Sequence, residues 1–217
     1  MIPRLDESFV ALAMAPVEMD ALWEEGWRHF GPVFYRYTKA EAGGGPKRVM
    51  PLRVDLSRFA PSKSQRRVLR RNADLDVRVQ SPVLDAERRA LFDAHHMRFT
   101  DNVPNSLDDF LGPAPALLPC RTVEVAAYAH GRLVAASYLD VGCRSASSIY
   151  AMFDPAESRR SLGIATMLWE IGHAKCHGFA HYYPGYCFHE PTSFDYKRAF
   201  AGTEWFDWRG AWRPLEP

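Results

Sequence analysis

The stretch SASSIYAMFDPAESRRSLGIATMLWEI, residues 145–171, decides the fold. Its first nine residues predict a β-strand, the acidic turn DPAE follows, and apolar residues at helical spacing then predict an amphipathic helix. The helix opens on the pattern Arg160-x-x-Gly163-x-Ala165. A helix N-terminus presents unpaired N–H groups and a positive dipole to an anion, and glycine lets that anion approach the backbone. The stretch therefore predicts a strand leading into a phosphate-binding turn.

The elements around this stretch predict a mixed α/β domain. Two strands joined by His130-Gly131 have the pattern of a β-hairpin. The predicted strands lie at 74–80, 121–129, 132–141, 145–153 and 179–188, and the predicted helices at 84–99, 106–112, 161–177 and 195–200. This order, with the turn pattern R/Q-x-x-G-x-G/A, resembles the GNAT-fold acyltransferases. The resemblance implies an α/β GNAT-like fold with a mostly antiparallel central sheet over residues 73–217.

The segment before this domain predicts a small N-terminal α/β subdomain, residues 1–72. Apolar residues at helical spacing predict a helix over residues 17–30, and VFYRY at 33–37 predicts a strand. The glycines and proline of AEAGGGPK, residues 40–47, predict a loop, and RVMPLRVDLSRF at 48–59 resumes a strand.

The stretch PSKSQRRVLRRN, residues 61–72, concentrates the basic charge of a nearly neutral chain. Residues 47–78 carry ten Lys/Arg against three Asp, so this segment is +7 and the remainder of the +1 chain is −6. Ser62 followed by Gln65 has the capping-box pattern, and the helix it starts places four arginines within about 140° of arc. Such a face predicts a polyanion-binding surface, and a solvated helix face is the alternative. Gln65 on the opposite side either belongs to a structured pocket or fastens the preceding loop.

Several stretches, read together, resemble the aminoacyl-tRNA–protein transferases, the arginyl- and leucyltransferase family of the N-degron pathway. They are PLRVDLSRFAPSKSQRRVLRRNADLDV, SSIYAMFDP, RSLGIATMLWEI, YYPGY and DYKRAF, in order from Trp27 onward. The resemblance implies an enzyme that moves arginine or leucine from charged tRNA to the amine of a protein N-terminus, as in protein arginylation. The polyanion bound by the basic helix would then be tRNA. An acyl-CoA-dependent N-acetyltransferase and a catalytically inactive tRNA-binding relative are the alternatives.

One departure from this family concerns cysteine. The family carries a cysteine cluster before the segment matching Met50–Val54, whereas this chain has none between residues 35 and 49. Its four cysteines are far apart and form no C-x-x-C pair. His173, Cys176 and His177 are spaced as i, i+3 and i+4 on the predicted helix and could in principle bind a metal. They fit the cation-rich end of a helix better than a metal site. We therefore expect no metal and no cofactor besides the aminoacyl-tRNA co-substrate. The range of expected acceptors also includes a peptide or a small amine besides a protein N-terminus.

Aminoacyl transfer needs an unprotonated amine and a path for its proton. An α-amine with a pKa near 8 is roughly a tenth neutral at pH 7, so a strong base is unnecessary. We predict Asp154, Tyr150 and Tyr186 as catalytic, with a helix cap as the alternative role of Asp154 and core packing as that of each tyrosine. The residues predicted to bind tRNA or substrate are Ser62, Ser64, Gln65, Arg66, Arg67, Arg70, Arg71, Arg160, Ser161, Leu162, Gly163, Tyr183 and Lys197.

The composition limits the location and the partners. A content of 47% hydrophobic and 24% charged residues is typical of a globular protein. No apolar run reaches the roughly 18–20 residues of a membrane span, and two acidic residues stand near the start where a signal peptide is apolar. We therefore expect a cytoplasmic protein that binds tRNA, with neither membrane nor DNA as a partner.

Overall fold

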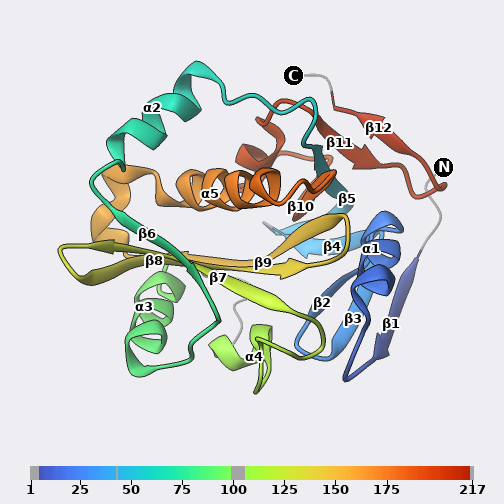
Figure 1. Cartoon of the computed structure of the whole chain (residues 1–217). Helices are drawn as coiled ribbons and strands as arrows, with labels where there is room; N and C mark the ends of the chain where they lie inside the picture. The colour runs from blue at the N-terminus through green and yellow to red at the C-terminus, as the bar shows by residue number, and fades with distance from the viewer. Residues whose placement is uncertain (1–4, 43, 99–105, 216–217) are drawn as a thin grey trace.

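The computed structural model of the chain describes residues 5–42, 44–98 and 106–215. Its central feature is one large sheet (Figure 1). The strand order is β12 (Trp212–Pro214), β11 (Thr203–Phe206), β5 (Gly45–Asp55), β10 (His181–Phe188), β9 (Ser145–Phe153), β8 (Arg132–Val141), β7 (Thr122–Ala129) and β6 (Asp76–Gln80), and β4 (Lys39–Ala42) pairs with β5. Among the described strand pairs of this sheet, only that of β9 with β10 is parallel. The predicted mixed α/β fold with a mostly antiparallel sheet is confirmed.

Helices cover both faces of this sheet (Figure 1). On one face lies α5 (Leu162–Cys176), with α2 (Lys63–Arg71) packed on its outer side; on the other lie α3 (Ala86–His96) and α4 (Leu107–Leu111). The core of the first face includes Leu168 and Ile171, and that of the second includes Phe92 and Phe110. None of the described helices has the length and apolar composition that a membrane crossing requires.

The N-terminal part adds a second, smaller sheet. It has the order β1 (Asp6–Val10), β3 (Val33–Tyr37) and β2 (Arg28–Phe30), and α1 (Pro16–Glu24) packs beside it through Met19 and Trp23. The strand β5 precedes residue 72, yet it is hydrogen-bonded to β10 on one side and to β11 on the other. The division at residues 72 and 73 stays a prediction, but the first segment supplies a strand to the interior of the main sheet.

Two N-terminal elements differ from those predicted. The helix expected over residues 17–30 ends at Glu24, because Gly26 turns the chain with a φ of +80° and β2 begins soon after it. The loop expected at residues 40–47 was wrong, since β4 and β5 form a tight hairpin there with Ala42 opposite Gly45. Gly43 in this hairpin and the last residue of the helix predicted at 84–99 lie outside the described residues.

The capping box and the later hairpin are confirmed. The Ser62 hydroxyl accepts the Gln65 N–H at 3.2 Å, and the Gln65 side-chain oxygen accepts the Ser62 N–H at 2.9 Å. Gln65 and Val68 are buried, whereas the four arginines of α2 are exposed. The turn between β7 and β8 has positive φ at both His130 and Gly131, as a two-residue hairpin turn requires.

A contact at Gly142 supports the attachment of α1 to the sheet. The Asp20 carboxylate of α1 accepts the N–H groups of Cys143 and Arg144, each at 2.9 Å. A Cβ on Gly142 would overlap Asp20 and lie 2.9 Å from Trp23 Cζ3, so a side chain here would push α1 away.

We expect Gly142→Ala to lower the free energy of unfolding by about 1–3 kcal/mol, as overpacking does in other interiors. Gly172→Ala is the matched control, because a Cβ there meets nothing within 4 Å on the exposed side of α5. That change should stabilise by about 0.5–1 kcal/mol. Urea unfolding of both variants measures the difference, and equal midpoints would contradict the contact described for Gly142.

Candidate active site

The turn between β9 and α5 holds Asp154 as a helix cap. Asp154 precedes the 3₁₀ helix η1 (Pro155–Arg160), where it accepts the Ala156 N–H at 2.8 Å and pairs with Arg132. Partial burial works against its ionisation, but these contacts outweigh burial and hold the pKa of Asp154 below its usual value. A carboxylate stabilised in this way is a weak proton acceptor. The geometry therefore favours the capping role, and a catalytic role for Asp154 stays a prediction.

Arg160 in this turn is engaged by two carboxylates of the protein. Its guanidinium lies 2.8 Å from Asp74 and 2.8 Å from Glu157. Gly163 has a different role in packing, since a Cβ there would lie 3.3 Å from the ring of Phe153. The glycine thus permits the close approach of α5 to β9. Anion binding by this turn, with Ser161 and Leu162 at the start of α5, stays a prediction.

The structure brings the arginine helix and this turn together. The Arg71 guanidinium donates to Arg159 O at 2.5 Å, and the Asn72 side-chain amide donates to Arg160 O at 2.9 Å. The start of α5 thus adjoins the C-terminal end of α2, so the two predicted anion-binding features form one surface. We call this surface the basic face; its exposed cations are Lys63, Arg66, Arg67, Arg70, Arg71 and Arg159, and Ser64 lies exposed at its edge.

The parallel strands β9 and β10 are paired over three residues and then separate. They pair only at His181 with Ser145, Tyr182 with Ala146, and Tyr183 with Ser147. Beyond these pairs β9 continues along β8 and β10 continues along β5. We call the place where β9 after Ser147 and β10 after Tyr183 are no longer paired with each other the fork.

Two cations from distant segments meet at the fork. Arg28 of β2 donates to the Ser147 hydroxyl and to Ser148 O, and Lys197 of the 3₁₀ helix η2 (Asp195–Arg198) donates to Tyr186 O at 3.4 Å. A Cβ on Gly185 would lie 3.5 Å from Lys197 Nζ and 3.7 Å from an Arg28 terminal nitrogen. Among the described residues, neither cation has a carboxylate within 4 Å. Two cations this close leave a site that suits an anion.

The environment of Lys197 supports this conclusion. Its side chain is half-buried, and its ammonium donates to the backbone of Tyr186. Burial, and next the charge of Arg28, lower the pKa of Lys197 to about 8. A bound anion would relieve both effects, because it would replace lost hydration and offset the charge of the neighbouring cation.

A carboxylate lies beneath the two cations. Glu170 of α5 is fully buried; its oxygens accept the Tyr182 hydroxyl at 2.5 Å and the Ser148 hydroxyl at 3.2 Å. Burial raises the pKa of Glu170 to about 7, although hydrogen bonds from neighbouring hydroxyls oppose the shift. Glu170 therefore changes its charge in the pH range in which aminoacyl transfer would operate.

Tyrosines line one side of the fork. Tyr186 donates from its hydroxyl to Gly26 O at 2.7 Å, and its ring meets Tyr37 edge-on at 5.4 Å. Tyr35 and Tyr37 are stacked, with ring centroids 5.6 Å apart. All three rings are half-buried. The hydroxyl of Tyr186 is thus held by the backbone, and the ring contributes a fixed wall.

The predicted site residues divide into those at the fork and those elsewhere. Tyr186 and Lys197 lie at the fork. Tyr150 stacks on Phe110 in the core under α4, and Tyr183 donates to Glu24 in the N-terminal core, consistent with the packing alternative for both.

Sequence reasoning missed the other residues at the fork, which are Arg28, Ser148, Glu170 and Tyr182. The available signal was a charge within an apolar run, since Glu170 interrupts TMLWEI on a helix predicted to be amphipathic.

The dismissed candidates His173, Cys176 and His177 do not form a group of three converging ligand atoms among the described residues. The rings of His173 and His177 lie with centroids 4.1 Å apart, and Cys176 and His177 are exposed at the end of α5. A different group does converge: His29, Cys120 and Asp140 place their ligand atoms within 4.8 Å of one another.

In this group, His29 already has oxygen partners at both ring nitrogens. They are Gly31 O at 2.9 Å and Asp140 at 2.6 Å. These hydrogen bonds account for the position of His29 without a metal, and the expectation that the protein holds no metal stays a prediction.

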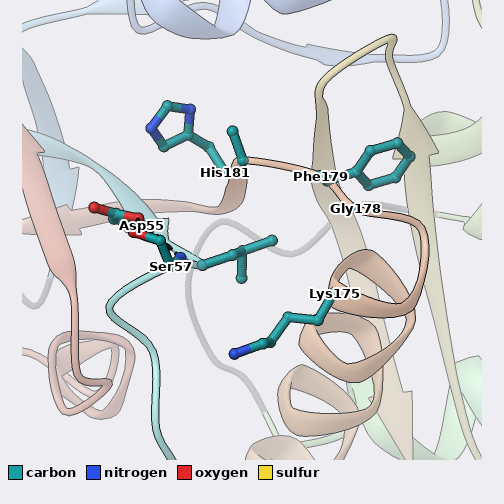
Figure 2. Close-up of a pocket in the computed structure, with 8 residues that line it drawn as sticks. Asp55, Ser57, Lys175, Gly178, Phe179 and His181 are labelled. Carbon is teal, nitrogen blue, oxygen red and sulfur yellow. Dashed lines mark hydrogen bonds between the residues drawn. The ribbon is translucent and has the colours of Figure 1, made fainter.

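A hollow lies at the opposite end of α5 from the turn (Figure 2). Its polar side chains include Asp55 at the end of β5, Lys175 of α5 and His181 at the start of β10. Asp55 accepts from Ser57, and Lys175 donates to Phe59 O at 3.2 Å. This hollow pairs a carboxylate with two basic groups, whereas the fork has two cations with no carboxylate within 4 Å among the described residues, so the fork is the stronger candidate for an anion site.

The antiparallel strands β7, β8 and β9, the helix α5 and the separating strand β10 form a GNAT-like fold. Two solved structures support the fold. L-PGS from Bacillus licheniformis matches with a TM-score of 0.53 and 16% identity, over 88% of this chain and 56% of that one. The C-terminal domain (DUF2156) of a putative lysylphosphatidylglycerol synthetase from Agrobacterium fabrum matches with a TM-score of 0.51 and 16% identity, over 83% and 54%. The chain thus spans little more than half of each.

Sequence comparison identifies the family. Residues 86–207 match the family described as arginine-tRNA-protein transferase, C terminus. The aspartate/glutamate leucyltransferase of Halorhodospira halophila is 34% identical, over 90% of this chain and 82% of the relative, and that of Pseudomonas fluorescens is 32% identical, over 92% and 86%. The chain belongs to the aminoacyl-tRNA–protein transferase family, as its motifs indicated. It is therefore an aminoacyl-tRNA-dependent aminoacyltransferase.

The burial of Glu170 predicts a pH-dependent stability. Its pKa rises from 4.5 to about 7 in the folded protein, so its contribution is fully present below pH 4.5 and is lost as the pH rises through 7. Glu170→Gln removes this loss, and we expect the variant to gain stability relative to the wild type between pH 5 and pH 8. Urea unfolding across this range measures it, with the exposed Asp93→Asn of α3 as control. A constant difference across the range would contradict the raised pKa.

Proposed function

We propose that the chain transfers leucine from charged tRNA to the α-amine of a protein or peptide whose first residue is aspartate or glutamate. The relatives' name, aspartate/glutamate leucyltransferase, supports both the donor and the acceptor. Arginine remains the second candidate for the transferred residue, because the matching family is described by arginine-tRNA. Since charged tRNA is the donor, we place the reaction in the cytoplasm and connect it with the N-degron pathway.

The observation that carries this proposal is the pair of cations at the fork. Arg28 and Lys197 approach the same glycine, Gly185, and neither has a carboxylate within 4 Å among the described residues. A carboxylate between them would receive charge-assisted hydrogen bonds from both, which are shorter and stronger than neutral ones. The side chain of an N-terminal aspartate or glutamate supplies such a carboxylate a few bonds from the reacting α-amine. Binding this side chain would therefore also hold the amine in position.

The reaction itself joins the α-amine to the ester carbonyl of the charged tRNA. The amine nitrogen forms a bond to that carbon, the bond from the carbon to the terminal ribose oxygen breaks, and the amine loses a proton while the ribose oxygen gains one. This exchange needs no oxidant or further cofactor. The residues of this chain would act by positioning the two substrates and by moving the proton.

The basic face is our proposed contact for the tRNA body. Its exposed cations gather on α2 and at the adjoining turn, where they would meet phosphates rather than bases because they form a broad face. The guanidinium groups of Arg66 and Arg71 donate to backbone carbonyls, whereas those of Arg67 and Arg70 have no hydrogen bond within the described part of the chain. Arg67 and Arg70 are therefore the two arginines best able to turn toward phosphate.

Acceptor choice tests the role of the cations. We expect Lys197→Met to raise the KM for a peptide beginning with aspartate by about 10- to 100-fold, the effect of removing one charge-assisted hydrogen bond. The matched substrate is the same peptide beginning with asparagine, for which wild type and variant should differ little. Transfer of radiolabelled leucine from charged tRNA measures both. An equal rise in KM for the two peptides would contradict the binding of the acceptor carboxylate at the fork.

Salt dependence tests the basic face. We expect the double variant Arg67→Ala, Arg70→Ala to bind charged tRNA more weakly and to flatten the dependence of log K on log salt by about 0.7–0.9 for each phosphate that is no longer neutralised. The control is Arg89→Ala with Arg213→Ala, two exposed arginines on α3 and β12 that pair with Asp108 and Asp207. Filter binding at several salt concentrations gives the slopes. Equal slopes for the two double variants would place the tRNA on another surface.

A further inference from the structure

Glu170 is a carboxylate enclosed without a cation in contact. It is 0% exposed, and among the described residues no Lys, Arg or His lies within 4 Å of its oxygens. Its hydrogen bonds come from two neutral hydroxyls, those of Tyr182 and Ser148. Burying an ionised group costs several kcal/mol unless it is paired or protonated. A glutamine would fill this space at lower cost, so packing alone does not account for a glutamate here.

Ser148 links this carboxylate to the fork. It follows Ser147, the last residue of β9 that pairs with β10, and its side chain is only half-buried. Its hydroxyl donates to Glu170 at 3.2 Å, while its backbone oxygen accepts from Arg28. The Ser148 hydroxyl therefore stands between the enclosed carboxylate and the residues that we assign to the acceptor.

We propose that Glu170, acting through the Ser148 hydroxyl, takes up the proton that the acceptor amine loses, an inference that rests on the proposed transferase reaction. When the amine nitrogen bonds to the ester carbon, its proton passes to Ser148 Oγ as Ser148 passes its own proton to Glu170. When the carbon–oxygen bond to the ribose breaks, the proton returns along the same path to the leaving oxygen. Glu170 ends ionised, as it began, and no further reactant is needed.

The surroundings of Glu170 suit this exchange. It is faced by Tyr182 on β10, by Ser148 on β9, by Ser137 on β8, and by Tyr196 and Lys197 on η2. Among the main influences on its pKa, no ionisable side chain comes from the other elements packed on α5, which are α2, β7, β8 and η1. Burial raises its pKa to about 7, close to the value near 8 of an α-amine. Proton transfer between groups of similar pKa is close to balanced in both directions.

Single-turnover transfer from charged tRNA at saturating acceptor tests the role of Glu170. An acceptor with an aminooxy group in place of the α-amine keeps the nucleophile unprotonated across the pH range. Any remaining decrease of the rate at low pH, the acidic limb of the pH–rate profile, therefore belongs to the enzyme. We expect the wild-type rate to fall as the pH drops below about 7. We expect Glu170→Gln to be slower by about 10²- to 10⁴-fold and to lack that limb, with unchanged tRNA affinity and acceptor KM.

Two further variants separate this role from a structural one. Ser148→Ala keeps the carboxylate and the Tyr182 hydrogen bond, and should show a similar loss of rate. Glu170→Asp keeps a titratable group and should recover part of the rate together with the limb. If both Glu170→Gln and Ser148→Ala kept the wild-type rate and its acidic limb, the role of Glu170 would be overturned and the proposed transferase function would stand. A wild-type protein that binds charged tRNA but transfers nothing would overturn the proposed function, and this inference with it.

Discussion

The short parallel pairing of β9 with β10 is the constraint on which the rest of the site depends. Three residue pairs hold the strands together, after which each follows its own antiparallel neighbour. The backbone oxygens of Ser148 on β9 and Tyr186 on β10 then accept hydrogen bonds from Arg28 and Lys197. The separation of the strands thus fixes where both cations stand. It also brings Glu170 of α5 within reach of hydroxyls from the two strands.

The parts of the fold that the sequence predicted are those set by neighbouring residues. The hairpin at His130-Gly131 needs two residues that tolerate positive φ, and the start of α2 needs Ser62 and Gln65 three positions apart. Both signals lie within four residues. The order of strands and helices from residue 74 to residue 200 was predictable for the same reason, because each element has its own periodicity, whereas β11 and β12 were not predicted.

What could not be predicted depends on contacts between distant residues. Arg28 lies 119 positions before Ser147, and nothing near it in the sequence distinguishes it from the other arginines of the chain. The insertion of β5 between β10 and β11 has no local signal either. At the hairpin of β4 and β5, glycine is compatible with both a loop and a tight turn, and the pairing of flanking strands decided between them. Tyr150 and Tyr183 show the same limit, since residue type alone does not distinguish a pocket from a core.

Gln65 has a role that joins the two halves of the site. Its side-chain amide donates to Ala199 O at 3.1 Å, two residues beyond Lys197. The helix with the exposed arginines is therefore fastened to the segment that carries a cation of the fork. The basic face and the fork are thus joined within the chain by a contact between residues 134 positions apart. In the proposed reaction, connected segments of one domain would hold the tRNA donor and the acceptor.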